Sequence, residues 1–159
     1  MRPSRRIPGG SVSPESLEAL AGPVARLMGV RGAVVVRVAF LPNRALQRLK
    51  LRHLGRRAAF VNVLTFPEPE GFPHPESRRR SLGEIYLNDS YPSSDPDEGV
   101  RMFIHGMAHL CGFNHKGRRD TIDMQAAEHR VLARIAKVRG TYRLSSHHQG
   151  KRYENSHRT

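Results

Sequence analysis

Cysteine and acidic residues are scarce in this chain of 159 residues, and tryptophan is absent. The single cysteine, Cys111, cannot close a disulfide within the chain, which favours a reducing compartment. No stretch reaches the roughly 18 consecutive apolar residues of a membrane helix, and no apolar signal core follows the N-terminal arginines. We therefore expect a cytoplasmic protein that has no membrane partner.

The shortage of acidic residues leaves a net charge of +13, since 27 Lys and Arg face only 14 Asp and Glu. Such an excess favours polyanionic partners such as RNA or DNA, because phosphate contacts release counterions. Residues 44–57 contain no acidic residue, and Arg78–Arg80 form a second basic run. Composition alone leaves an ordinary solvated surface equally open, because runs of charge are usually just surface.

Apolar residues are concentrated in the middle of the chain, and both ends are poor in them. Residues 1–10 and 143–159 are expected to be flexible basic arms, because few apolar side chains are present to offset the entropy of ordering them. Residues 11–142 have the length of one compact domain.

Local patterns predict helices and strands in irregular alternation. The predicted strands are Ala33–Phe40, Ala58–Phe66 and Leu82–Asn88, and the predicted helices begin at Pro14, span Arg44–Leu54, span Pro96–Cys111 and end near Gly140. Gly22-Pro23 must kink or split the first helix, Asp95 and Glu98 form a capping box, and Pro67–Arg80 is a mobile loop. We expect a single small α+β domain, with a mixed sheet of three to four strands covered by helices and a metal site on a central helix.

Three closely spaced histidines form the pattern that most clearly indicates a chemical function. His105 and His109 are four residues apart, so they lie on the same face of a helix. Gly112 lets the backbone turn sharply, so that His115 can come back toward this pair. Three neutral imidazoles with an open fourth position suit one catalytic zinc ion per chain, with no small-molecule cofactor. Cys111 points to another side of the helix and is expected to be a small buried residue.

The residue after the first histidine argues against a familiar zinc protease. The H-E-x-x-H pattern needs glutamate there as the general base, and this chain has Gly106. The choice therefore tilts from peptide hydrolysis toward chemistry in which zinc hydroxide and a positive surface suffice, such as phosphodiester hydrolysis.

At these residues the sequence resembles the YbeY family, whose signature is H-G-x-x-H-L-x-G-x-x-H. The matching residues are His105, Gly106, His109, Leu110, Gly112 and His115. The resemblance covers roughly Ala33 to Val138 and extends to Asn62–Pro67, Leu82–Ile85, Met124 and Glu128.

The resemblance implies a zinc-dependent endoribonuclease of single-stranded RNA that acts in ribosomal RNA maturation, at the 16S rRNA 3′ end, and in ribosome quality control. Its implied partners are ribosomal RNA and the small ribosomal subunit. The three histidines carry over as metal ligands and catalytic residues. The family also has an arginine in a basic turn, and a one-residue shift makes Arg56 or Arg57 its counterpart here. Both are candidate catalytic residues, which together with the Arg78–Arg80 run would clamp the RNA backbone.

Three positions depart from the family pattern. Asn114 replaces an aspartate before the third histidine and cannot serve as a base, Val61 replaces a threonine, and Glu84 replaces an aspartate. Two alternative functions therefore stay open. One is a non-catalytic, zinc-containing assembly factor that binds RNA or the ribosome, and the other is a metallopeptidase with an unrecognised base. Structural zinc sites usually have four protein ligands, and only three are found here.

Overall fold

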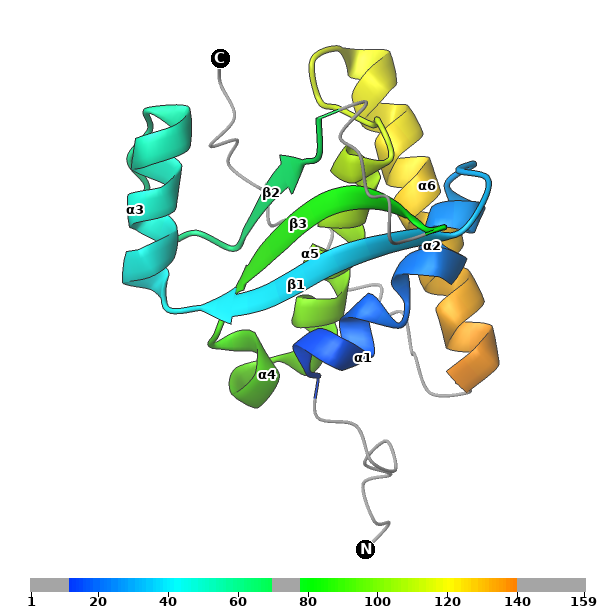
Figure 1. Ribbon diagram of the computed structural model, residues 1–159, viewed down its shortest axis with the longest axis horizontal. Coiled ribbons are helices and arrows are strands. Elements are labelled where there is room, and N and C mark those ends of the chain that lie inside the picture. Colours follow the sequence, from blue (N-terminus) through cyan, green and yellow to red (C-terminus); the bar gives the residue numbers. More distant parts are fainter. Residues whose placement is uncertain (1–11, 70–77, 140–159) are drawn as a thin grey trace, which may run out of the picture.

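The computed structural model describes residues 12–69 and 78–139. Their elements are α1 (Pro14–Glu18), α2 (Ala21–Leu27), β1 (Val34–Leu41), α3 (Asn43–Leu54), β2 (Val63–Pro67), β3 (Arg80–Asn88), α4 (Tyr91–Ser94), α5 (Pro96–Leu110) and α6 (Arg118–Arg139). Figure 1 shows their arrangement. Both predicted arms and the middle of the predicted loop lie outside the described residues. Within that described part, no helix combines the length and apolar character needed to cross a bilayer.

The central strand of the sheet is β3. Among the described residues the strand order is β1-β3-β2, with β1 parallel and β2 antiparallel to β3. The sheet is therefore mixed, and the expected α+β class with its covering helices is confirmed. The predicted bounds of β1 are correct to within one residue, whereas β3 begins two residues earlier than predicted.

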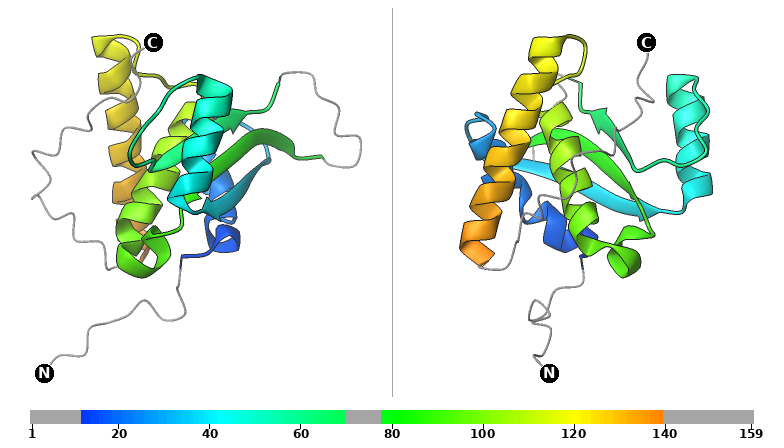
Figure 2. Two further views of the ribbon diagram at one scale, coloured as in Figure 1. Left: turned by 90° about the vertical axis from the view of Figure 1, so that its left-hand side faces the viewer. Right: turned by 180° about the vertical axis from the view of Figure 1, so that it is seen from behind.

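Helix α5 covers one face of the sheet at short range. Thr65 and Val38 are the register partners of Ile85 on either side, so the three side chains form one row across that face. Gly106 of α5 lies so close that a Cβ there would be 3.0 Å from Thr65 Cγ2 and 3.1 Å from Ile85 Cγ2. In Figure 2, α6 lies against α5 on the side away from α3. The main core fills the space between these layers.

Helix α3 packs against the other face of the sheet, opposite α5. Leu64 precedes Thr65 on β2 and therefore points to the other face. It is buried with Leu46 of α3 and with Val61 in a second, smaller core cluster. Figure 2 shows β2 between α3 and α5. Strand β2 therefore contacts α5 through one of its faces and α3 through the other.

The predicted strand Ala58–Phe66 is wrong in its first half, because β2 begins only at Val63. The preceding residues run beside α3 instead. The Asn43 side chain donates to the carbonyl of Ala59 over 3.0 Å and accepts from the Val61 N–H over 2.9 Å. The Gln47 amide also donates to Ala58 and Ala59 at 2.9 Å. The side chains of α3 therefore make the hydrogen bonds to these backbone groups that a neighbouring strand would otherwise make.

The start of α2 also differs in detail from the sequence prediction. The predicted split falls at Ala19 and Leu20, ahead of Gly22-Pro23. Pro23 is the third residue of α2, where its missing N–H has no helical partner in any case.

A short helix, α4, was not predicted. It precedes Asp95, whose side chain caps α5 by accepting from the Glu98 N–H over 3.1 Å, as predicted. The backbone N–H of Asp95, which the other half of a capping box would use, donates to the Tyr91 carbonyl and so ends α4.

Candidate metal centre

Helix α5 holds the first two histidines rigidly. Its apolar stripe is buried, with Phe103, Ile104 and Met107 fully covered. His105 and His109 lie one turn apart and remain half-buried. Because the rest of the helix is fixed by the core, the positions of these two rings are fixed as well.

The end of α5 returns the chain toward the same two rings. Gly112 has φ +100°, the left-handed conformation predicted for it. Its N–H donates to the His109 carbonyl over 3.1 Å, and the Phe113 N–H donates to the Ala108 carbonyl over 3.0 Å. These two bonds form a Schellman stop. The stop reverses the chain so that His115 faces the helix it has just left.

Asn114 shapes the turn that carries His115. Its side-chain oxygen accepts a hydrogen bond from the Lys116 N–H over 2.9 Å, which closes a local turn around the third histidine. An amide in this position has a structural use. It supplies no proton acceptor of the kind that an aspartate would offer.

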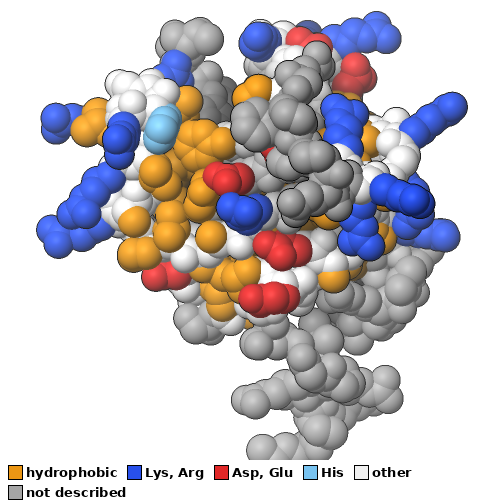
Figure 3. Space-filling view, in the orientation of Figure 1, with side chains coloured by type: hydrophobic (Ala, Val, Ile, Leu, Met, Phe, Trp, Pro, Cys, Tyr) orange, Lys and Arg blue, Asp and Glu red, His pale blue; other side chains and the backbone are white. Residues whose placement is uncertain are grey.

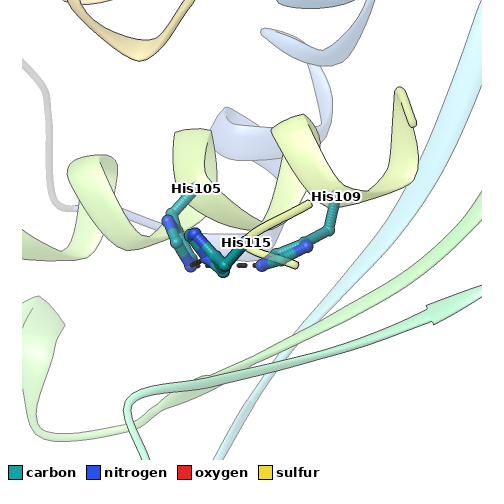
Figure 4. Close-up of side chains that lie close together, drawn as sticks. All are labelled: His105, His109 and His115. Atoms are coloured by element: carbon teal, nitrogen blue, oxygen red, sulfur yellow. Dashed lines mark hydrogen bonds between the residues drawn. The ribbon is translucent and has the colours of Figure 1, made fainter. Parts of the chain in front are cut away.

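The three rings converge through the same ring atom. His105 Nε2 lies 3.3 Å from His109 Nε2 and 3.4 Å from His115 Nε2. All three ligand atoms lie within 4.8 Å of one another, and Figure 4 shows the rings pointing together. Zn–N bonds of about 2.0–2.1 Å at tetrahedral angles place ligand nitrogens about 3.3–3.4 Å apart. The two distances from His105 therefore match the spacing of tetrahedral ligands, and each of the three rings offers a nitrogen to one shared position.

A carboxylate on α6 orients the first ring. His105 Nδ1 lies 2.9 Å from Glu128 Oε1. A proton on Nδ1 that is donated to this carboxylate leaves the Nε2 lone pair free for a metal. Glu128 was noted in the sequence only as part of the family resemblance. Its contact with His105 depends on how α6 packs against α5, which no local pattern in the sequence shows.

Burial and neighbouring charge favour the neutral form of His115. Desolvation lowers the pKa of His115, the neighbouring His105 lowers it further, and Glu128 partly offsets both effects. Since only a neutral imidazole binds a metal, this environment favours the ligand form.

The remaining candidates lie elsewhere. Arg56, half-buried, and Arg57, exposed, lie in the turn after α3. Cys111 packs half-buried against the main core, where burial raises the pKa of its thiol to about 11. It does not belong to the described group of ligand atoms.

The close packing of α5 on the sheet at Gly106 explains why no glutamate follows the first histidine of the site. A Cβ at this position would already lie 3.0 Å from Thr65 and 3.1 Å from Ile85, so even the first atom of a side chain would require these neighbours to shift. A glutamate there would push α5 away from the sheet, so the H-E-x-x-H arrangement is incompatible with this packing.

Comparison with known proteins places these features in a family. The model of the family described as Endoribonuclease YbeY matches residues 12–136. The Endoribonuclease YbeY of Roseiflexus is 30% identical over 122 residues, which cover 69% of this chain and 76% of that protein. That of Rhodopseudomonas palustris is 29% identical over 83 residues, covering 47% of this chain and 44% of that protein.

A solved structure from Thermotoga maritima is 19% identical, with a TM-score of 0.44 over 83% of this chain and 89% of that one. The chain spans less than half the length of several curated relatives that it matches. The family model nevertheless covers well over half of this chain. The chain therefore belongs to the YbeY family.

Proposed function

We propose that this protein is a zinc-dependent endoribonuclease that cuts single-stranded ribosomal RNA in the cytoplasm. Its tasks would be maturation of the 16S rRNA 3′ end and ribosome quality control, on the small subunit. The fold core, residues 11–142, would carry the activity. The basic ends, 1–10 and 143–159, would add charge toward RNA.

The observation that carries this proposal is the convergence of three histidine nitrogens within 4.8 Å of one another, two of their distances being 3.3 and 3.4 Å. His105, His109 and His115 would hold one zinc ion. That ion would supply a Lewis acid and lower the pKa of a coordinated water toward about 7. Three protein ligands leave a fourth position for water or substrate, as in catalytic rather than structural zinc sites.

The chain's own residues would divide the remaining work. Glu128 accepts the Nδ1 proton of His105 and keeps that ring in the tautomer that binds metal. Arg56 and Arg57, in the turn after α3, would hold backbone phosphates. RNA is the favoured substrate because the net charge is +13 and the family relatives are endoribonucleases by name.

A cleavage assay with one matched pair of variants tests this function. His109→Ala removes a ligand, and His129→Ala removes an exposed histidine from α6. The substrate is a single-stranded RNA with the 16S 3′-end sequence. We expect His109→Ala to lose at least about a hundredfold in cleavage rate, and His129→Ala to cleave as the unaltered chain does. A chelator should abolish cleavage, and added zinc should restore it.

The same variants separate the enzyme from a non-catalytic binding factor. If zinc has a structural role, His109→Ala will lower the thermal unfolding midpoint and RNA affinity along with any activity. If zinc is catalytic, the unaltered chain keeps its fold and its RNA affinity when the metal is removed, and His109→Ala matches it in both. Cleavage that survives in His109→Ala would refute the proposed active site.

A further inference from the structure

A cavity of about 370 Å³ lies between α2 and α6. Its lining includes the exposed side chains of Arg26, Leu27 and Arg134, so it opens to solvent. None of its lining residues belongs to the metal centre or to α3. In Figures 1 and 2, α2 and α6 lie on the side of the molecule away from α3. The proposed cleavage of RNA therefore makes no use of this cavity.

The α2 side of the cavity is an apolar stripe. The residues at the i, i+3, i+4 and i+7 positions of one helical face line it, namely Leu20, Pro23, Val24 and Leu27. Val24 is buried in the main core, whereas 37% of Leu27 is exposed. Ile135 adds an apolar side chain from α6. An apolar groove between two helices is the kind of surface that accepts the apolar side chains of an amphipathic segment.

The charged lining residues of the cavity, Arg26 and Arg134, are both positive. Neither of them is in an ion pair within residues 12–69 and 78–139. Residues 19–67 and 129–153 contain no Asp or Glu, so α2 and the second half of α6 supply no acid to balance them. Figure 3 shows Lys and Arg side chains projecting from the side of the molecule that α2 and α6 form, as well as from the side of α3. A ligand that brings carboxylates to the rim would therefore be attracted to it.

The positive rim disfavours two occupants that this chain itself could provide. Residues 140–159 follow α6 directly, but they contain a single acid, Glu154, among several Lys and Arg. A second copy of the chain carries a net charge of +13 and would be repelled.

The apolar lining disfavours RNA as the occupant. Single-stranded nucleic acid is held largely by stacking of its bases on aromatic rings, and no aromatic residue lines the cavity. Leucine-like side chains flanked by carboxylates match both the interior and the rim. A protein segment of that composition is the occupant that fits best.

We propose that the cavity between α2 and α6 is a docking site for an acidic, amphipathic segment of a partner protein. The apolar side chains of that segment enter between Leu27 and Ile135, and its carboxylates pair with Arg26 and Arg134. Because the site shares no residue with the metal centre, a partner can occupy it whether or not the protein cuts RNA.

The test uses a fluorescein-labelled peptide with leucines at i, i+3, i+4 and i+7 and glutamates elsewhere. Its affinity is measured by fluorescence anisotropy at physiological salt. Leu27→Glu and Leu51→Glu each replace an exposed leucine and change the net charge equally, but Leu51 lies on α3. We expect Leu27→Glu to weaken binding at least about tenfold, because it places a charge at the apolar centre of the site. Leu51→Glu should weaken binding less than about threefold.

A second pair of variants tests the rim and avoids any effect on the apolar lining. Arg134→Glu should weaken binding about fivefold, whereas Arg48→Glu, an exposed cation of α3, should weaken it less than about twofold. A peptide with lysines in place of the glutamates should bind at least about tenfold more weakly to the unaltered chain. Urea midpoints of all four variants check that each still folds.

Several results would overturn the docking site. Equal losses within each pair of variants would mean that the peptide responds only to net charge. Absence of binding, or equal binding of the lysine peptide, would exclude an acidic segment as the occupant. Self-association of the unaltered chain that Leu27→Glu abolishes would assign the cavity to a second copy. An affinity for single-stranded RNA that falls in Leu27→Glu but not in Leu51→Glu would assign it to RNA.

Discussion

His105 and Glu128 join α5 to α6 through one contact of 2.9 Å between Nδ1 and a carboxylate oxygen. The two residues are 23 positions apart in the sequence, and each side chain is 22% exposed. The contact therefore belongs to the tertiary packing of two helices, and it determines which nitrogen of His105 faces the other histidines.

Removing this carboxylate should weaken metal binding without dismantling the ligand set. We expect Glu128→Ala to lower zinc affinity by about 10- to 100-fold, because second-shell partners orient and polarise a ligating imidazole. Glu128→Gln, which can still accept a hydrogen bond, should lose less. Competition with a chromogenic chelator measures the affinity. Asp123→Asn changes an exposed acid on the same helix and should bind zinc normally. Normal binding by Glu128→Ala would contradict the assigned role.

Gly83 should tolerate no side chain. Its φ is +135°, and a Cβ would overlap the Phe66 carbonyl oxygen and lie 2.9 Å from Pro67 Cα. Gly83→Ala therefore combines backbone strain with a clash against the neighbouring strand. We expect it to lower the free energy of unfolding by about 3 kcal/mol or more in urea denaturation.

Gly22 provides the matched control for that substitution. A Cβ there meets nothing within 4 Å, and the residue lies in α2. Gly22→Ala should raise the free energy of unfolding by up to about 1 kcal/mol, through helix propensity and a less flexible unfolded chain. Similar effects of the two substitutions would show that the close approach at Gly83 is relieved by movement of β2.

Cys111 should make stability depend on alkaline pH. Burial raises the pKa of its thiol from 9.0 to about 11, while the charge of Arg80 acts in the opposite direction. Between these values the unfolded thiol loses its proton and the folded thiol keeps it, so the folded state loses stability as pH rises from about 9 to 11. Urea unfolding at pH 8 and pH 10 should show a larger loss for the unaltered chain than for Cys111→Ala. Equal losses would place the alkaline transition on other groups.

The convergence of the three histidines could be predicted from the sequence because their geometry is local. His105, His109 and His115 lie within 11 consecutive residues, and a helix period followed by a glycine stop brings them together. The orienting role of Glu128 could not be predicted in this way. It depends on the approach of α6 to α5, which side chains far apart in the sequence decide.

The burial of Lys50 could not be predicted from the sequence for a related reason. Within a run of cations it resembles its exposed neighbours, and only packing against the sheet separates it from Arg48 and Arg52. The strand prediction failed over Ala58–Asn62 because apolar composition was taken as a sign of pairing. The carbonyl groups of Ala58 and Ala59 and the N–H of Val61 are bound by α3 side chains instead.

Asn43 should therefore carry much of the stability of that segment. Its side chain both donates to Ala59 and accepts from Val61, so Asn43→Ala leaves the Val61 N–H without its acceptor at the edge of the second core cluster and leaves the Ala59 carbonyl with Gln47 as its donor. We expect the free energy of unfolding to fall by about 1–3 kcal/mol. Arg44→Ala, at the exposed neighbouring position, should change it by less than about 0.5 kcal/mol. Equal urea midpoints for the two variants would mean that Gln47 alone holds the segment against α3, since its amide reaches the same carbonyl groups.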